Sequence, residues 1–243
     1  MTSLESRIVH REAGFLVVDK PPGLVSAGPP HHIHGEPAPR QSVESLLVAA
    51  LHRQVWAVHQ LDRMTSGLNI FALKPSLVAP LAERLKTPGA KRYLAIVHGH
   101  PHAPQTIDAP LTMALDSATG KLNPAVAFTS STHDQPVRTA LTHLLKSTPN
   151  AGIPADFALV EVSLETGRQH QVRLHLAHIG HPLVGESMHR NPPCTLHLRH
   201  ALHAFRLTLP ATSSMAALDL TAPLPEDLVA LATRLGIALS SSA

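Results

Sequence analysis

Short apolar runs that end at turn residues recur along the chain, and their length limits the folds it can adopt. Phe15 to Asp19 (FLVVD) is such a run, and it stops at the turn sequence KPPG of Lys20 to Gly23. This arrangement is typical of a strand that enters a tight turn. No apolar run approaches the roughly 18–20 residues that cross a bilayer as a helix, so we expect no membrane span.

Segments with helical periodicity alternate with these runs. Gln41 to Arg53 carries its apolar residues on one helical face, and Ser42 stands where an N-cap is expected. Gly180 is expected to end the helix predicted over Gln169–Ile179. Further helices are predicted over Ser76–Lys86, Gln169–Ile179 and Glu226–Leu235. Further strands are predicted over Val55–Val58, Leu68–Leu73, Arg92–Val97, Phe157–Leu164 and His200–Leu209.

The arrangement favours one domain. The chain has 243 residues, and it contains neither an internal repeat nor a linker long enough to separate independent domains. Two segments rich in proline and polar residues, 27–40 and 99–135, are expected to be irregular. We therefore predict a single mixed α/β (α+β) domain over residues 1–243.

Charge and cysteine usage suggest a partner and a compartment. Lys and Arg number 20 against 17 Asp and Glu, a net charge of +3 with His neutral. Arg84, Lys86, Lys91 and Arg92 fall within nine positions, which suits either a solvated face or a polyanion site. The single cysteine, Cys194, excludes an internal disulfide. With no apolar signal segment at the N-terminus, it favours the cytoplasm.

Nineteen histidines raise the question of a metal site. They include His31, His32, His34, His170, His175, His178 and His181. On a helix only the 175/178 pair of the later group shares a face, and neither an HExxH motif nor a carboxylate at ligand spacing accompanies it. We therefore expect no metal, and a histidine-rich metal-dependent hydrolase stays as a minor alternative.

The segment HQLDRMTSG, His59 to Gly67, carries the clearest chemical signal. Asp62 is expected on a turn between two apolar strands, a position that presents a carboxylate well for chemistry. The alternative is an aspartate that only bonds its own turn backbone. The local sequence leaves both readings open.

Four segments in order resemble the RluA branch of the pseudouridine synthases. HQLDRMTSG is similar to that family's HRLDxxTSG signature. FLVVDKPPGLVS (Phe15 to Ser26), KRYLAIVHG (Lys91 to Gly99) and LETGRQHQVRLHLAHIGHPLVGE (Leu164 to Glu186) resemble three further blocks. The resemblance covers residues 15–209. It implies a pseudouridine-synthase-like catalytic domain with a central mixed, largely antiparallel sheet flanked by helices, and no room for an N-terminal S4 domain.

The resemblance also implies residue roles. Asp62 matches the catalytic aspartate, which opens the C1′–N1 glycosidic bond of a target uridine so that the base can rejoin through C5. Tyr93 matches the tyrosine that packs on the target base. Arg173 matches the arginine that pairs with the catalytic carboxylate. A guanidinium at about 4 Å contributes on the order of 4 kcal/mol at an effective dielectric near 20, enough to keep a carboxylate ionised.

The expected substrate is structured rRNA or tRNA with a loop uridine, flipped out of its stack for reaction. The expected substrate-binding residues are Gln60, Arg63, Thr65, Lys91, Arg92 and Arg168. No cofactor is expected, because the reaction is an isomerisation. No obligate protein partner is evident, and a monomer is expected. An inactive RNA-binding protein on the same fold is the main alternative.

Two departures from the family pattern stand out. Gln60 replaces the usual arginine before the catalytic turn, which puts RNA affinity or target choice in doubt more than chemistry. The last block ends in Gly-Glu-Ser at 185–187 where the family prefers Gly-Asp followed by a tyrosine, and Met188-His189 stand instead.

Overall fold

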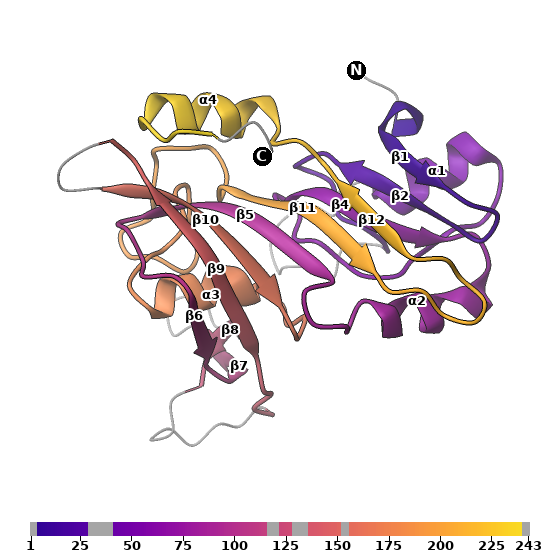
Figure 1. Ribbon diagram of the computed structural model, residues 1–243, viewed down its shortest axis with the longest axis horizontal. Coiled ribbons are helices and arrows are strands. Elements are labelled where there is room, and N and C mark those ends of the chain that lie inside the picture. The colour runs from indigo at the N-terminus through magenta and orange to yellow at the C-terminus, as the bar shows by residue number, and fades with distance from the viewer. Residues whose placement is uncertain (1–3, 29–40, 116–121, 128–135, 152–155, 240–243) are drawn as a thin grey trace. The chain divides into compact units, whose positions relative to one another are not determined.

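The computed structural model describes residues 4–28, 41–115, 122–127, 136–151 and 156–239. These residues form two compact units, Met1–Ala90 with His203–Ala222 and Lys91–Leu202 with Pro223–Ala243. Each unit combines strands with helices, so the α+β class is confirmed (Figure 1). Most of the irregular segment expected at 27–40 lies outside the described residues.

The first unit is built on a mixed sheet. Its strands are β1 (Ile8–Arg11), β2 (Phe15–Lys20), β3 (Trp56–Ala57), β4 (Ser66–Ala72), β11 (Leu202–Leu209) and β12 (Leu218–Thr221). The order is β1-β2-β4-β11, with β12 beside β11 and β3 beside β4. The β4–β11 pair is parallel, and the other pairs are antiparallel.

Both faces of this sheet are buried, which explains the uninterrupted apolar run of β2. Alternate side chains of a strand point to opposite faces. One face of β2 packs with Leu81 of helix α2 (Val78–Arg84), and the other packs with Leu47 of helix α1 (Val43–Leu51). The sheet therefore holds the loop between β3 and β4 on a rigid base.

The predicted N-cap of α1 is confirmed. The Ser42 hydroxyl accepts a hydrogen bond from Ser45 N at 3.0 Å, and Ser45 Oγ accepts one from Ser42 N at 2.9 Å. This reciprocal pair satisfies two backbone donors at the helix start. The helix begins at Val43, two residues after the predicted start at Gln41.

The second unit contains an antiparallel sheet in the order β5-β10-β9-β6 and a separate β7–β8 hairpin (Figure 1). Its strands are β5 (Lys91–His98), β6 (Gln105–Asp108), β7 (Leu111–Leu115), β8 (Leu122–Val126), β9 (Leu141–Pro149) and β10 (Phe157–Leu164); its helices are α3 (Gln171–His178) and α4 (Glu226–Arg234). Leu174 of α3 packs with Leu111 and Ala140. None of the described helices is long and apolar enough to cross a bilayer.

The segment 99–135 differs from the expected irregular structure, because its described part contains β6, β7 and β8. β6 is stabilised by pairing with β9, from Gln105↔Leu144 to Asp108↔Leu141. Such pairing joins residues more than thirty positions apart, so local composition does not reveal it.

Two predicted helices also start later than expected. A 3₁₀ turn, η2 (Pro75–Leu77), precedes α2. α3 begins at Gln171 because His170 adopts a left-handed conformation with φ 55°. Gly180, with φ 84°, follows the end of α3 as predicted.

Candidate active site

Asp62 lies in the loop that joins β3 to β4 in the first unit, and it is half-buried. Thr65 N donates to the backbone carbonyl of Asp62 at 3.0 Å and closes a four-residue turn. This bond uses the backbone of Asp62 and not its carboxylate. The turn that presents Asp62 is therefore closed through its backbone.

The residue after Asp62 is fixed by a buried lysine. Lys20 has no exposed surface, and its ammonium donates to the carbonyls of Pro21, Leu24 and Arg63 at 3.0, 2.8 and 3.1 Å. Gly23 N also donates to the Arg63 carbonyl, at 2.8 Å. The KPPG turn after β2 is therefore bonded directly to the turn that presents Asp62.

The residue before Asp62 is fixed by the same segment. Leu61 N donates to Ser26 Oγ at 3.0 Å, and both residues are buried. The segment from Lys20 to Ser26 thus holds both chain neighbours of Asp62. Sequence analysis noted this segment as a family block but assigned its residues no role; the signal was the lysine at the end of an apolar strand.

Substituting methionine for Lys20 should destabilise the first unit by about 2–4 kcal/mol. The change leaves carbonyl groups in a buried region without their donor, at roughly 1–3 kcal/mol for each group left unsatisfied. Urea unfolding of wild type and variant measures the effect. Lys86→Met in the same unit is the matched control, because Lys86 is exposed and its ion pair is with exposed Glu83. The role of Lys20 would be refuted if the free energy of unfolding of Lys20→Met lay within about 0.5 kcal/mol of the control, the usual range for surface substitutions.

Contacts at the start of β4 explain why the motif contains Ser66 and Gly67. Ser66 Oγ bonds His203 Nδ1 at 3.0 Å, and His203 Nε2 bonds the Ala222 carbonyl at 3.2 Å. A carbonyl only accepts, so Nε2 carries the proton and Nδ1 accepts from the serine. Gly67 has φ 109°, and a Cβ there would lie 2.2 Å from the Ala204 carbonyl oxygen. Only glycine allows β11 to approach β4 this closely.

Tyr93 and Lys91 lie on one face of β5 in the second unit, because strand residues two apart share a face. Tyr93 is buried and lies opposite Val162 of β10. Arg92 points to the other face, where its Nη1 pairs with Glu161 Oε1 at 3.0 Å. The geometry therefore separates Arg92 from Tyr93, two residues that sequence analysis grouped together.

Lys91 and Arg168 lie near the turn that follows β10. A side chain at Gly167 would meet Lys91 Nζ at 3.4 Å, and burial lowers the pKa of Lys91. Arg168 N donates to Gln171 Oε1 at 3.0 Å, and Arg168 Nε donates to the Thr139 carbonyl at 3.1 Å. Both bonds of Arg168 stabilise the turn into α3.

Arg173 projects from α3 and forms a bidentate ion pair with Glu186. Its Nε donates to Oε2 at 2.9 Å and its Nη2 to Oε1 at 2.7 Å, with both side chains buried. Burial alone would raise the pKa of Glu186, but the hydrogen bonds and charge of Arg173 outweigh it and lower the pKa to about 2. Sequence analysis did not identify Glu186 as a site residue, although it noted the departure at this position.

His200 lies next to this ion pair. Its burial, followed by the positive charge of Arg173, lowers its pKa from 6.5 to about 2, so its imidazole is neutral at physiological pH. His170 and His189 also lie close by and bond through Nδ1 and Nε2 at 2.8 Å. The result is a buried polar group around Arg173.

Acid should destabilise the protein through His200. Its folded-state pKa lies below the unfolded value of 6.5, so the unfolded chain binds one more proton as the pH falls below 6.5. Between pH 7 and pH 5 this group removes about 2 kcal/mol of stability. Denaturant unfolding at several pH values measures this effect. Between pH 7 and pH 5 the free energy of unfolding should fall by about 2 kcal/mol less in His200→Gln than in the wild type. Parallel curves for the two proteins would contradict the assignment.

The described histidines do not support a metal site. His175 Nε2 bonds the Ala109 carbonyl at 2.9 Å, and His181 Nδ1 bonds the His98 carbonyl at 2.9 Å. Within the described ranges, no three His, Cys, Asp or Glu side chains gather as metal ligands. His31, His32 and His34 lie outside those ranges.

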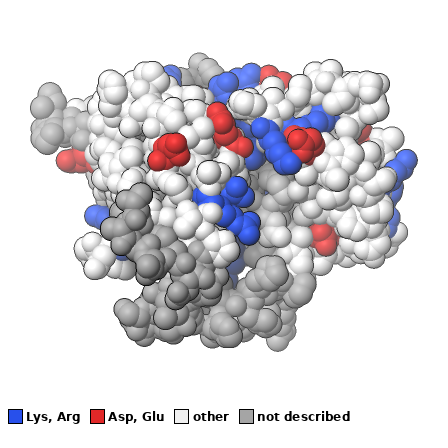
Figure 2. Space-filling model, turned by 90° about the horizontal axis from the view of Figure 1, so that it is seen from below, with Lys and Arg blue, Asp and Glu red and all other residues white. Residues whose placement is uncertain are grey.

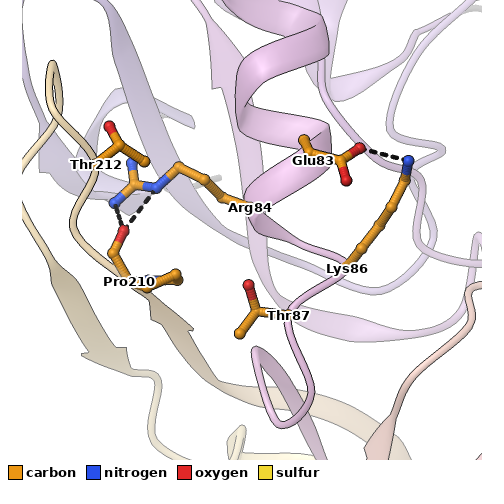
Figure 3. A pocket seen from close by; sticks show the side chains of 6 residues that line it. All are labelled: Glu83, Arg84, Lys86, Thr87, Pro210 and Thr212. Carbon is orange, nitrogen blue, oxygen red and sulfur yellow. Dashed lines mark hydrogen bonds and ion pairs between the residues drawn. The ribbon is translucent and has the colours of Figure 1, made fainter.

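The basic cluster predicted around residues 84–92 is not one continuous face. Arg84 is buried and donates to the carbonyls of Pro210 and Ala216, beside a shallow cavity of about 380 Å³ (Figure 3). Lys86, on the rim of this cavity, pairs with Glu83. On the face drawn in Figure 2, Lys and Arg side chains likewise lie beside Asp and Glu side chains. Arg84 is thus a structural residue.

The predicted site residues divide between the two units. The first unit brings together Gln60, Asp62, Arg63 and Thr65 on one loop, where Gln60 and Arg63 are exposed and Thr65 is buried. The second unit holds Lys91, Arg92, Tyr93, Arg168 and Arg173. Each unit arranges its own members as described above.

Comparisons with known proteins identify the family. The family model described as RNA pseudouridylate synthase matches residues 14–178, a range that includes Asp62, Tyr93 and Arg173. A tRNA pseudouridine synthase C of Haemophilus influenzae is 30% identical over 94% of this chain and 97% of its own length. A ribosomal large subunit pseudouridine synthase D of Zymomonas mobilis is 31% identical over 91% of this chain and 70% of its own.

A third relative and a solved structure extend the comparison. An RNA pseudouridine synthase of Chloroflexus aurantiacus is 34% identical over 86% of this chain, which spans 63% of that protein's length. The fold is similar to that of human RNA pseudouridylate synthase domain containing 4, with a TM-score of 0.71 at 23% identity over 97% of this chain and 95% of that one.

These matches define the class of protein as an isomerase that acts on RNA. The chain belongs to the RNA pseudouridylate synthase family, and the resemblance inferred from its sequence is confirmed.

Proposed function

We propose that this chain converts specific uridines in tRNA or rRNA to pseudouridine, with Asp62 as the catalytic residue. The observation that carries the proposal is the Asp62 turn, whose two neighbours are bonded to the Lys20–Ser26 segment. Such rigid support suits a side chain that must meet a reacting carbon in one geometry. Family membership supports the reaction type.

In this proposal the reaction needs only the chain's own side chains. Asp62 opens the bond between C1′ and N1 of the uridine, the base turns, and C1′ rejoins it at C5. The hydrogen on C5 leaves to water as a proton and the freed N1 gains a proton from water, so the product is an isomer of the substrate. In the proposal Tyr93 packs against the base, and Arg173 is the cationic partner of the Asp62 carboxylate.

The RNA contacts are proposed from exposure and charge. Gln60 and Arg63 are exposed near Asp62 in the chain, which supports a role in contacting the nucleotides around the target. Lys91 and Arg168 are proposed to meet phosphates. Arg92 and Thr65 remain weaker predictions. Arg92 pairs with Glu161, and Thr65 is buried in the turn.

Substrate class and setting complete the proposal. Relatives named for tRNA and for the large ribosomal subunit support these two RNA classes. A uridine in a loop is favoured, because flipping it out costs less than the few kcal/mol needed in a stacked helix. We propose a cytoplasmic monomer with one catalytic domain that works without a cofactor.

Mapping of pseudouridines across rRNA and tRNA tests the target. Cells that lack this protein should lose the modification at one or a few uridines, and expression of the wild-type chain should restore it. Expression of Asp62→Asn should not. Restoration by Asp62→Asn would contradict the catalytic role proposed for Asp62.

A further inference from the structure

We propose that Glu186 is a positioning residue that sets the orientation of the Arg173 guanidinium. The inference rests on the role proposed above for Arg173. Two bonds join the pair, at 2.9 Å from Nε and 2.7 Å from Nη2. A bidentate contact fixes both the position and the plane of a guanidinium, whereas a single bond lets it turn.

Glu186 is itself held from several sides. Its Oε1 accepts hydrogen bonds from the backbone N–H groups of Met188 at 2.9 Å and His189 at 3.2 Å. Its own backbone is bonded at both ends, through its N–H to the Leu183 carbonyl at 3.2 Å and through its carbonyl to Cys194 N at 2.8 Å. The carboxylate is therefore a fixed anchor for Arg173.

The preceding residue adds to this rigidity. Gly185 has φ 76°, and a Cβ there would lie 2.0 Å from the Arg199 carbonyl oxygen. The chain segment of Arg199 thus packs directly on the backbone beside Glu186. Small shifts of the carboxylate would require this close contact to open.

The burial of the pair points to a role beyond stability. The Arg173 and Glu186 side chains are 4% and 0% exposed, whereas Asp227, which forms a similar bidentate pair with Arg199, is 38% exposed. Removing both charges from water is costly, and apolar residues of similar size often stabilise a fold as well. In addition to any stability, a buried bidentate pair holds the charged Arg173 guanidinium in one orientation.

The charges around Glu186 keep it in one state. Arg173 faces its carboxylate, His189 is the further charge that acts on it, and the neighbouring His200 is neutral at physiological pH. The pKa of about 2 leaves the carboxylate ionised throughout the neutral range. Glu186 is therefore suited to hold Arg173 and not to transfer a proton.

Two substitutions at this position test the inference. Glu186→Gln keeps the shape but removes the charge and one acceptor, and we expect the single-turnover rate to fall at least 30-fold. Glu186→Asp keeps the charge but is one methylene shorter, and we expect a threefold to tenfold loss. In both variants RNA affinity should stay within threefold. Single-turnover rates and binding are measured on tRNA and rRNA transcripts carrying tritium at uridine C5, alongside thermal unfolding.

Asp227→Asn is the matched control. It removes the carboxylate from the Arg199 pair of the same unit, and it should leave the rate within twofold. A folded Glu186→Gln variant within threefold of the wild-type rate would overturn the proposal. So would a control variant that is slowed as much as Glu186→Gln.

If Glu186→Gln does not fold, Glu186→Asp decides. A threefold or greater rate loss with wild-type melting and binding supports the positioning role, and a wild-type rate overturns it. Arg173→Met, assayed in parallel, separates this inference from the proposed function. If Arg173→Met is inactive while folded Glu186→Gln is active, only the role of Glu186 fails. If Arg173→Met is active, the role proposed for Arg173 fails first.

Discussion

Asp62→Asn is expected to lower pseudouridine formation by at least about 10³-fold, in the range of a lost catalytic group. Asparagine has nearly the same shape, but it lacks the carboxylate to which the proposal assigns the opening of the glycosidic bond. RNA binding should stay level or tighten, because one negative charge near phosphates is removed. The turn should remain intact, since Thr65 N bonds the backbone carbonyl of residue 62 and not its side chain.

Turnover and filter binding on the same RNA measure both effects. Asp219→Asn is the control, because Asp219 is an exposed carboxylate of the same unit that pairs with Arg206. This control should keep wild-type turnover. Measurable turnover by purified Asp62→Asn, above the level of contaminating enzyme, would remove Asp62 from the catalytic role.

If Arg173 is the partner of the catalytic carboxylate, as proposed, Arg173→Met should reduce the rate by at least about 10²-fold, because that carboxylate then loses its cationic partner. The same change leaves Glu186 buried without its partner, which costs roughly 3–5 kcal/mol of stability. Rates are therefore compared under conditions where unfolding curves show both proteins folded. Arg173→Lys should recover only part of the activity, because lysine lacks the planar fork that binds Glu186 through two bonds.

The size of the rate loss in the Arg173 variants distinguishes a role in the reaction from a purely structural role. A folded Arg173→Met variant within about threefold of wild type would mean a barrier change below ~1 kcal/mol. That result would leave Arg173 as a purely structural partner of Glu186. Full recovery by Arg173→Lys would likewise show that charge alone suffices and that orientation does not matter.

Local patterns predicted much of the secondary structure because their causes are local. The β10 strand from Phe157 to Leu164 and the Ser42 cap of α1 follow from side-chain alternation and from a short hydroxyl side chain at a helix start. By contrast, β6 was missed because its stability comes from pairing with β9. The division into two compact units was also not visible in the sequence.

The candidate site shows the same limit. The motif around Asp62 could be found from the sequence, but the contacts that fix it could not. Lys20 bonds a carbonyl 43 positions away, and a sequence pattern does not show which carbonyl it meets. Glu186 was noted as a departure, yet only its geometry reveals the bidentate pair with Arg173. The ion pair of Arg92 with Glu161, on the face of β5 opposite Tyr93, was likewise not visible in the sequence.

Release of tritium from uridine C5 tests the central claim most directly. Purified wild-type protein is incubated with tRNA and rRNA transcripts labelled at C5, because a new bond from C1′ to C5 must displace that hydrogen to water. We predict release equal to one or a few uridines per molecule in one of the two RNA classes, from wild type but not from Asp62→Asn. Binding of both RNA classes without any tritium release, by folded wild-type protein, would contradict the account.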